Sequence, residues 1–248
     1  MDFKNKIVLI TGAAGQLGTE LANKFVSLGA YLYILDASES NLNVLRNKLP
    51  KDKILGVFVV DISSPDSVSE AFKKIKDLDV LVNNAAIAVF TPFRERDYSD
   101  FMNVISVNLG GTFLCTQKAL GLMEKQKKGC IVNIGSIYGI VSSDSSIYTD
   151  CSRMNSEVYS ASKAAIIQLT KYYAAHVASS GVRVNCVSPG GIFNSQGVDF
   201  IKNYSSKVPM KRMADVSEIC EAILFLASEQ ASYITGQNLV VDGGFTVW

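Results

Sequence analysis

The chain alternates between short stretches that are continuously apolar and longer stretches whose apolar residues recur every three or four positions. The short runs indicate strands covered on both faces, and the longer period indicates amphipathic helices. Strands are expected at residues 7–11, 31–36, 54–60, 80–83, 130–134, 182–187 and 238–241. Helices are expected at residues 17–28, 38–49, 65–76, 98–126, 157–179 and 216–227. This alternation predicts an α/β, doubly wound Rossmann fold of about seven parallel strands with helices on both faces.

No repeat, low-complexity tract or Pro/Gly linker divides the chain, so residues 1–248 are expected to form a single domain. The net charge is +1 without a dense basic run, which argues against a nucleic-acid partner. The first apolar run is too short for a signal peptide or a membrane span. Five widely spaced cysteines without a CxxC pair favour reduced thiols, no metal site and a soluble cytoplasmic protein.

A glycine-rich turn, TGAAGQLG, follows the first expected strand and precedes a helix. Such a turn lets backbone N–H groups approach a pyrophosphate, and the helix N-terminus favours the anion. A dinucleotide is therefore expected to contact Gly12, Gly15, Gln16, Leu17 and Gly18. A tight turn without a ligand is the alternative.

Asp36 ends the second expected strand, 18 residues beyond Gly18. An acid at about this offset accepts hydrogen bonds from the adenosine ribose hydroxyls and repels a 2′-phosphate. Ala37 follows, and no arginine stands next to it, so NAD is expected rather than NADP. The alternative is that Asp36 caps the next helix, a role that Ser38 could equally fill.

Polar or small residues also follow the third and fourth strands. Asp61 and Ile62 are expected at the adenine, and Asn84 and Ala85 where the backbone passes close to the ligand. The alternatives are a helix cap at Asp61 or Ser63 and a plain turn at residues 83–86.

Tyr159 and Lys163 stand four residues apart in an expected helix, so their side chains should share one face. An ammonium group one turn away favours the ionised form of a phenol whose ordinary pKa is about 10. Ser136 follows the fifth strand and is a candidate to hold a substrate oxygen, with a turn residue as the alternative. Asn108, followed by two glycines, predicts a kink in the helix of residues 98–126.

These motifs together resemble the short-chain dehydrogenase/reductase family over most of the chain. The resembling stretches are TGAAGQLG, Asp61-Ile62, NNAA at 83–86, Asn108, Ser136, YSASK at 159–163, RVNCVSPGGI at 183–192 and ITGQNLVVDGGF at 234–245. The resemblance implies a catalytic set of Asn108, Ser136, Tyr159 and Lys163. It also implies cofactor contacts at Tyr159, Lys163, Pro189, Gly190 and Ile192, besides the residues named above.

Several positions depart from the family pattern. Gln16 replaces the middle glycine of the first turn, Ala86 the glycine of NNAG, Gly135 a serine and Asn194 a threonine. Ser136 and Tyr159 are 23 residues apart, a longer spacing than is usual in the family. The inserted residues 142–155, SSDSSIYTDCSRMN, are polar, which favours a polar substrate, unless they form a solvated loop. The insert together with SPGGIFNSQ at 188–196 also resembles a bacterial subgroup associated with flagellin modification and nonulosonic-acid or amino-sugar biosynthesis.

The resemblance implies reversible hydride transfer between nicotinamide and a secondary alcohol or ketone, with Tyr159 moving the proton and Asn108 holding a water. Two alternatives are a 3-oxoacyl-thioester reductase and a non-catalytic redox sensor. Four basic residues, Lys202, Lys207, Lys211 and Arg212, lie where the family has a substrate lid, and could meet an anion or solvent. The lone histidine, His176, is expected to be structural. The apolar C-terminus, ending at Trp248, predicts a homodimer or homotetramer.

Overall fold

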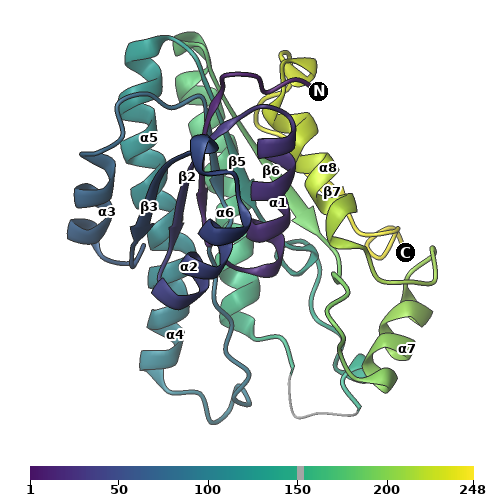
Figure 1. Cartoon of the computed structure of the whole chain (residues 1–248). Coiled ribbons are helices and arrows are strands. Elements are labelled where there is room, and N and C mark those ends of the chain that lie inside the picture. Colours follow the sequence, from purple (N-terminus) through teal and green to yellow (C-terminus); the bar gives the residue numbers. More distant parts are fainter. Residues whose placement is uncertain (150–153) are drawn as a thin grey trace.

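A computed structural model describes residues 1–149 and 154–248 and shows one seven-stranded parallel sheet (Figure 1). The strands run in the order β3-β2-β1-β4-β5-β6-β7. Their bounds are Ile7–Thr11 (β1), Tyr31–Asp36 (β2), Ile54–Val59 (β3), Val80–Asn83 (β4), Gly129–Ile134 (β5), Val182–Pro189 (β6) and Asn238–Val241 (β7). The strand order reverses between β1 and β4, which is where doubly wound sheets bind their ligands.

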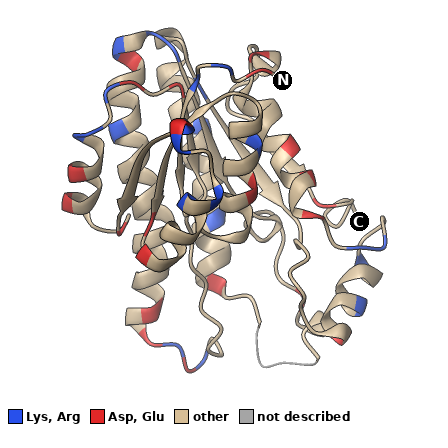
Figure 2. Ribbon diagram, viewed as in Figure 1, with Lys and Arg blue, Asp and Glu red and all other residues tan. Residues whose placement is uncertain are grey.

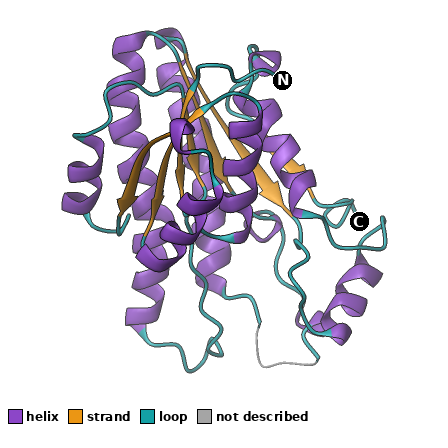
Figure 3. Ribbon diagram, in the orientation of Figure 1, coloured by secondary structure: helices purple, strands orange, loops and turns teal. Residues whose placement is uncertain are grey.

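Helices connect the strands and cover both faces of the sheet (Figure 3). Their bounds are Gln16–Ser27 (α1), Glu39–Lys48 (α2), Pro65–Phe72 (α3), Tyr98–Val104 (α4), Thr112–Gln126 (α5), Glu157–Val177 (α6), Val198–Lys207 (α7) and Val216–Ala227 (α8). A π-helical turn, Ile105–Gly111, joins α4 to α5.

Two apolar cores lie on opposite sides of the sheet because neighbouring strand residues point to opposite faces. On β1, Val8 and Ile10 pack against α1, α2 and α8, whereas Leu9 packs against α3, α5 and α6. All three β1 side chains are fully buried. Burial on both faces explains why the strands are continuously apolar, and the predicted fold class is confirmed.

The expected elements match the structure closely, with three differences, the first being that the helix expected at residues 65–76 ends at Phe72. The helix expected at residues 98–126 is interrupted by the π-helical turn, where the Thr112 hydroxyl donates to the Asn108 carbonyl at 2.7 Å. This is the irregularity expected from Asn108 and the glycines. The helix α7 was not expected, because its sequence had been interpreted only as a basic lid.

Basic and acidic residues are interspersed along the helices and loops of the ribbon in Figure 2. Within residues 1–149 and 154–248, no helix combines the length and apolar character needed to cross a lipid bilayer.

We predict that Gly18→Ala destabilises the fold by about 1–3 kcal/mol, because a Cβ there would collide with the Gly12 carbonyl oxygen and lie 2.7 Å from Ala13 Cα. Urea unfolding provides the measurement. Gly121→Ala, in α5, is the matched control: its Cβ meets nothing within 4 Å, and a gain of about 0.5–1 kcal/mol is expected. Equal stability changes in the two variants would contradict this account of Gly18.

Candidate functional site

A pocket of about 350 Å³ lies at the carboxyl ends of β1–β4, beside the reversal of strand order. Most of the expected cofactor residues line it together. They are Gly12, Gly15, Gln16, Leu17, Asp36, Asp61, Ile62, Asn84 and Ala85. Gly18 does not line this pocket; it is buried behind the turn and allows α1 to approach β1 closely.

Contacts with the end of β4 fix the conformation of the turn after β1. Gly12 has a φ of +61°, and a Cβ there would lie 2.7 Å from Ala85 Cα. The Asn84 amide donates to the Gly12 carbonyl at 2.8 Å and to the Thr11 carbonyl at 3.0 Å. The Thr11 hydroxyl accepts from the backbone N–H of Asn84 and of Ala85, each at 3.1 Å. Thr11 and Asn84 therefore tie the glycine-rich turn to the end of β4.

Asp36 is fixed at the end of β2 rather than capping a helix. Its two carboxylate oxygens accept from the Ala14 and Ser38 backbone N–H groups, each at 3.0 Å. Ser38 is the cap of α2, through its hydroxyl and Asn41 N at 3.3 Å. The capping alternative for Asp36 is therefore wrong, and its carboxylate faces the pocket.

The caps expected after β3 also differ. Asp61 accepts from the Ser63 backbone N–H at 2.9 Å and the Ser63 hydroxyl at 2.7 Å, while Ser64 caps α3. Asp61 is exposed in the pocket wall, and Ile62 is buried against Gly111.

Gln16 spans from the glycine-rich turn to the segment after β6. Its side-chain N–H donates to the Phe193 carbonyl at 2.7 Å. Pro189 ends β6, and Ile192 forms a bridge to Ala214, so this segment contacts the residues before α8 and does not line the β1–β4 pocket. Gly190 must be small, because a Cβ there would lie 2.9 Å from both Asp242 Cα and the Tyr204 hydroxyl.

The catalytic candidates meet where β5 ends against the first turns of α6. Ser156 caps α6, with its hydroxyl accepting from Tyr159 N at 3.2 Å. Lys163 Nζ donates to the carbonyl of Ile134, the last residue of β5, at 2.8 Å, and lies 5.6 Å from the centre of the Tyr159 ring. Ser136 follows two residues later and forms a side-chain hydrogen bond with Tyr159. The expected shared face of Tyr159 and Lys163 is confirmed.

Burial dominates the titration of this pair. It raises the pKa of Tyr159, although the hydrogen bond from Ser136 lowers that pKa, and it lowers the pKa of Lys163 to about 8. The net shift of the phenol in the polypeptide is thus upward, opposite to the direction expected from its lysine neighbour alone. The desolvation of both groups is the physical reason.

Asn108 is fully buried and joins the loop after β4 to α6. Its amide donates to the Ile87 carbonyl at 3.0 Å and to the Ser162 hydroxyl at 3.1 Å, and its oxygen accepts from Ile87 N at 2.8 Å. Both amide N–H bonds are used inside the protein, so any water held by Asn108 would have to bind an oxygen.

Packing explains why a glycine, Gly135, stands where the family usually has a serine before Ser136. A Cβ on Gly135 would lie 2.5 Å from Ser188 Oγ and 2.9 Å from Cys186 Sγ. Both atoms belong to β6, whose side chains occupy the space that a serine at 135 would need.

Sequence reasoning missed three tyrosines beside these candidates. Tyr138 is tied to Ser136, whose hydroxyl accepts from Tyr138 N at 3.1 Å. Tyr148 belongs to the insert, and its hydroxyl lies 3.1 Å from that of Tyr138. Tyr204, on α7, accepts a hydrogen bond from Gly191 N. Only Tyr138 carried a sequence signal, its position two residues after Ser136.

Residues expected outside the chemistry are placed accordingly. His176 is exposed on α6, where it bonds the Tyr172 carbonyl and stacks on the Tyr172 ring at 4.1 Å. Of the insert, residues 150–153, which include Arg153 and Cys151, lie outside the described residues.

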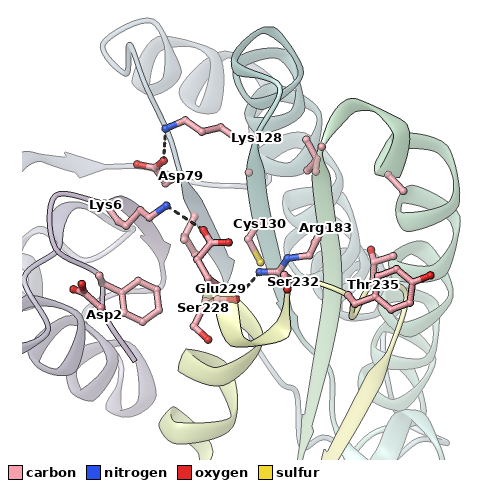
Figure 4. Close-up of a pocket in the computed structure, with 18 residues that line it drawn as sticks. Asp2, Lys6, Asp79, Lys128, Cys130, Arg183, Ser228, Glu229, Ser232 and Thr235 are labelled. Carbon is pink, nitrogen blue, oxygen red and sulfur yellow. Dashed lines mark hydrogen bonds and ion pairs between the residues drawn. The ribbon is translucent and has the colours of Figure 1, made fainter.

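A cavity of about 560 Å³ lies at the opposite, amino edge of the sheet (Figure 4). Its charges are paired within the protein: Lys6 with Glu229 at 3.2 Å, and Lys128 with Asp79 at 3.0 Å. Arg183 donates to the Leu226 and Ser228 carbonyls after α8. These contacts join elements together and make the cavity part of the scaffold.

A dinucleotide-type pocket beside a Ser-Tyr-Lys cluster defines the class of nicotinamide-dependent α/β oxidoreductases. A family model described as enoyl-(acyl carrier protein) reductase matches residues 12–246. With that match and with relatives of 30–36% identity over nearly the whole chain, the protein belongs to the short-chain dehydrogenase/reductase family, whose members act on alcohol and ketone substrates.

Three relatives show the breadth of the similarity. A 3-oxoacyl-(acyl-carrier-protein) reductase of Thermotoga maritima is 34% identical over 100% of both chains. A glucose 1-dehydrogenase of Gluconobacter oxydans is 36% identical, covering 99% of this chain and 94% of its own. A post-translational flagellin modification protein A of Campylobacter coli is 30% identical over 98% of both.

Among solved structures, a short-chain dehydrogenase from Leptospira borgpetersenii with bound NAD+ is similar. It has a TM-score of 0.89 and 41% identity, with 99% of this chain and 94% of that chain covered.

The depressed pKa of Lys163 predicts a pH-dependent stability. Between about pH 8 and pH 10.5 the unfolded chain holds a proton that the folded lysine has lost, so stability should rise with pH. Relative to Lys163→Met, the wild type should gain up to about 3 kcal/mol across this window in urea unfolding. Lys171→Met, an exposed change on the same helix, is the control and should leave the pH profile unchanged. A wild-type profile parallel to that of Lys163→Met would refute the prediction.

Proposed function

We propose that the protein is an NAD-dependent oxidoreductase that transfers a hydride reversibly between nicotinamide and the carbinol carbon of a polar, carbohydrate-like alcohol or ketone. The observation that carries this proposal is the cluster of Tyr159, Ser136 and Lys163 at the end of β5, next to the β1–β4 pocket.

The residues present fit a nicotinamide dinucleotide. Gly12 lets the turn pack against Ala85, where a side chain would collide, so that the backbone of the turn lines the pocket. The Asp36 carboxylate is held by two backbone N–H groups in the same pocket, where the ribose would lie. The diphosphate would be held by Gly12, Gly15, Gln16 and Leu17, and the adenine by Asp61 and Ile62. At Asn84 and Ala85 the protein backbone would pass close to the ligand. Pro189, Gly190 and Ile192 would border the nicotinamide. The bound Leptospira relative supports this assignment.

The nicotinamide supplies the hydride chemistry, and the protein supplies orientation and the proton. Burial keeps the Tyr159 phenol protonated at neutral pH, so its hydroxyl can donate to a carbonyl oxygen during reduction. Ser136 Oγ would hold the same substrate oxygen as negative charge develops on it. During oxidation Tyr159 must accept the carbinol proton, which the Lys163 ammonium and the positive charge of oxidised nicotinamide favour. Asn108 fixes the loop after β4 against α6.

Hydroxyl groups gather next to the segment that follows Ser136, although Ser136, Tyr159 and Lys163 do not themselves line the cavity there. A cavity of about 580 Å³ beside Tyr138 is lined by Ser142, Ser143, Asn155 and Ser160 among others. These groups suit a hydroxylated substrate better than an acyl chain. The glucose dehydrogenase and flagellin-modification relatives support this choice, whereas the Thermotoga relative favours a second candidate, a 3-oxoacyl-thioester reductase.

We also infer that residues 1–248 act as one domain, and that a second copy covers apolar groups of this chain. Trp248 is 77% exposed, and Phe113 on α5 and Tyr172 on α6 are exposed as well. Exposure of such apolar groups to water is unfavourable in free energy. The expected assembly is a homodimer or homotetramer.

An absorbance assay of cofactor oxidation and reduction tests the proposal. We expect turnover of carbohydrates and other polyols, including nucleotide-linked or phosphorylated sugars, to exceed turnover of aliphatic ketones and of a 3-oxoacyl thioester. Tyr159→Phe should abolish turnover while NAD still binds, because only the proton carrier is removed. Wild-type turnover in that variant would rule out the role of Tyr159. Preferred turnover of the thioester would select the second candidate, and binding of NAD without any turnover would revive a redox sensor.

The Asp36 carboxylate predicts tighter binding of NAD than of NADP, because a 2′-phosphate would approach a fixed negative charge. In fluorescence titrations, Asp36→Asn should reduce the ratio of the Kd for NADP to the Kd for NAD by roughly tenfold, about 1.4 kcal/mol. Asp52→Asn, an exposed change away from the pocket, should not alter it. Tighter binding of NADP by the wild type would overturn the assignment.

A further inference from the structure

The described part of the insert, residues 142–149, is packed against α7. Ile147 is fully buried in a cluster with Phe200, Tyr204 and Val208 of the α7 region. The Tyr148 and Phe200 rings lie 5.3 Å apart. This part of the insert, called the wall below, is therefore anchored on α7 through Ile147 and Tyr148, while Ser142, Ser145, Ser146 and Thr149 remain exposed to solvent.

Polar contacts fix the same wall on either side of the apolar cluster. Lys207 Nζ lies 3.0 Å from an Asp144 carboxylate oxygen, and the Asn203 amide donates to the Thr149 hydroxyl at 2.8 Å. The hydrogen bonds from Ser146 and the ion pair with Lys207 lower the pKa of Asp144 to about 2, so the pair persists at neutral pH. Tyr148 lies between these two contacts in the sequence.

The wall is also connected to the catalytic candidates. Tyr138 N donates to Ser136 Oγ at 3.1 Å, and the Tyr138 and Tyr148 hydroxyls are 3.1 Å apart. Tyr148 is one of the groups that raise the pKa of Tyr159, after burial, which places the two phenols in one electrostatic environment. Tyr138 is partly buried, and burial raises its pKa far above the ordinary value. Tyr148 is therefore linked to Ser136 through Tyr138.

Among the described residues, three cations of α7 and the segment after it are engaged by protein groups. Lys207 pairs with Asp144, Arg212 pairs with Glu218 at 2.6 Å, and Lys211 donates to the Ser206 carbonyl at 3.1 Å. Lys211 also lies 5.7 Å from the Trp248 ring centre. Besides the Lys163 ammonium, the described groups linked to Ser136 and Tyr159 on this side are the neutral phenols of Tyr138 and Tyr148, which recognise hydroxyl oxygens.

We propose that Tyr148, held by Tyr138 and by α7, is a specificity-determining residue that hydrogen-bonds a second, uncharged hydroxyl next to the reacting carbinol of the substrate. The preferred substrates are then neutral vicinal diols or hydroxy ketones. This inference rests on the proposed function and names the substrate group that the insert recognises.

The test compares pairs of substrates that differ by one hydroxyl: 2,3-butanediol with 2-butanol, and 1,2-cyclohexanediol with cyclohexanol. Wild-type kcat/KM should be higher for each diol. Tyr148→Phe keeps the ring on Phe200 but removes the hydroxyl, so it should lower kcat/KM for the diols roughly tenfold to a hundredfold. Its kcat/KM for the mono-alcohols and its Kd for NAD should stay within about twofold of wild type.

Tyr233→Phe is the matched control, because Tyr233 is fully exposed and lines the amino-edge cavity. It should not change the ratio of kcat/KM for either diol to kcat/KM for its mono-alcohol. Lys207→Met, which breaks the ion pair with Asp144, should reduce the diol preference in the same direction as Tyr148→Phe. Equal losses on diols and mono-alcohols, or no loss on either, would overturn the role of Tyr148. A wild type that binds NAD but oxidises none of the four alcohols would instead refute this substrate class, and turnover elsewhere in the wider panel would then keep the proposed function.

Discussion

One buried hydrogen bond sets the geometry of the candidate active site: Lys163 Nζ to the carbonyl of Ile134. An ammonium group that is 2% exposed is stable only where its protons meet acceptors, and this carbonyl is the final one of β5. The bond locks the second turn of α6 to the strand end that delivers Ser136. The relative position of Ser136 and Tyr159 therefore follows from backbone structure rather than from loop conformation.

A second polar network beneath that corner holds the central strands to the helices. The Asn83 amide donates to Asn133 at 2.8 Å and to Thr116 at 3.0 Å, and the Asn133 amide donates to Thr170 at 2.9 Å. These buried groups join β4, β5, α5 and α6 in a layer that is otherwise apolar. Directional bonds of this kind specify one register between sheet and helices, which apolar packing alone does not.

The sequence predicted the sheet well because burial on both faces leaves a continuous apolar signature, as in Ile7–Thr11 and Val80–Asn83. Site residues could be predicted where they are close together in the sequence, as Tyr159 and Lys163 are, or where they follow directly from the end of a strand, as Asp36 does. Contacts made by residues far apart in the chain were not predicted. Ile147 gave no signal because its partners lie on α7, and the choice between Ser38 and Asp36 as the cap depended on backbone direction. The pKa of Tyr159 required its burial, which spacing does not report.

The hydrogen bond from the Gln16 side chain to the Phe193 carbonyl joins the glycine-rich turn to the segment that leads to α7. The turn belongs to the first β-α unit, and Phe193 lies at the start of the segment that leads to α7. Separation of these two elements therefore requires loss of this amide–carbonyl hydrogen bond, which is exposed and contributes only about 1 kcal/mol.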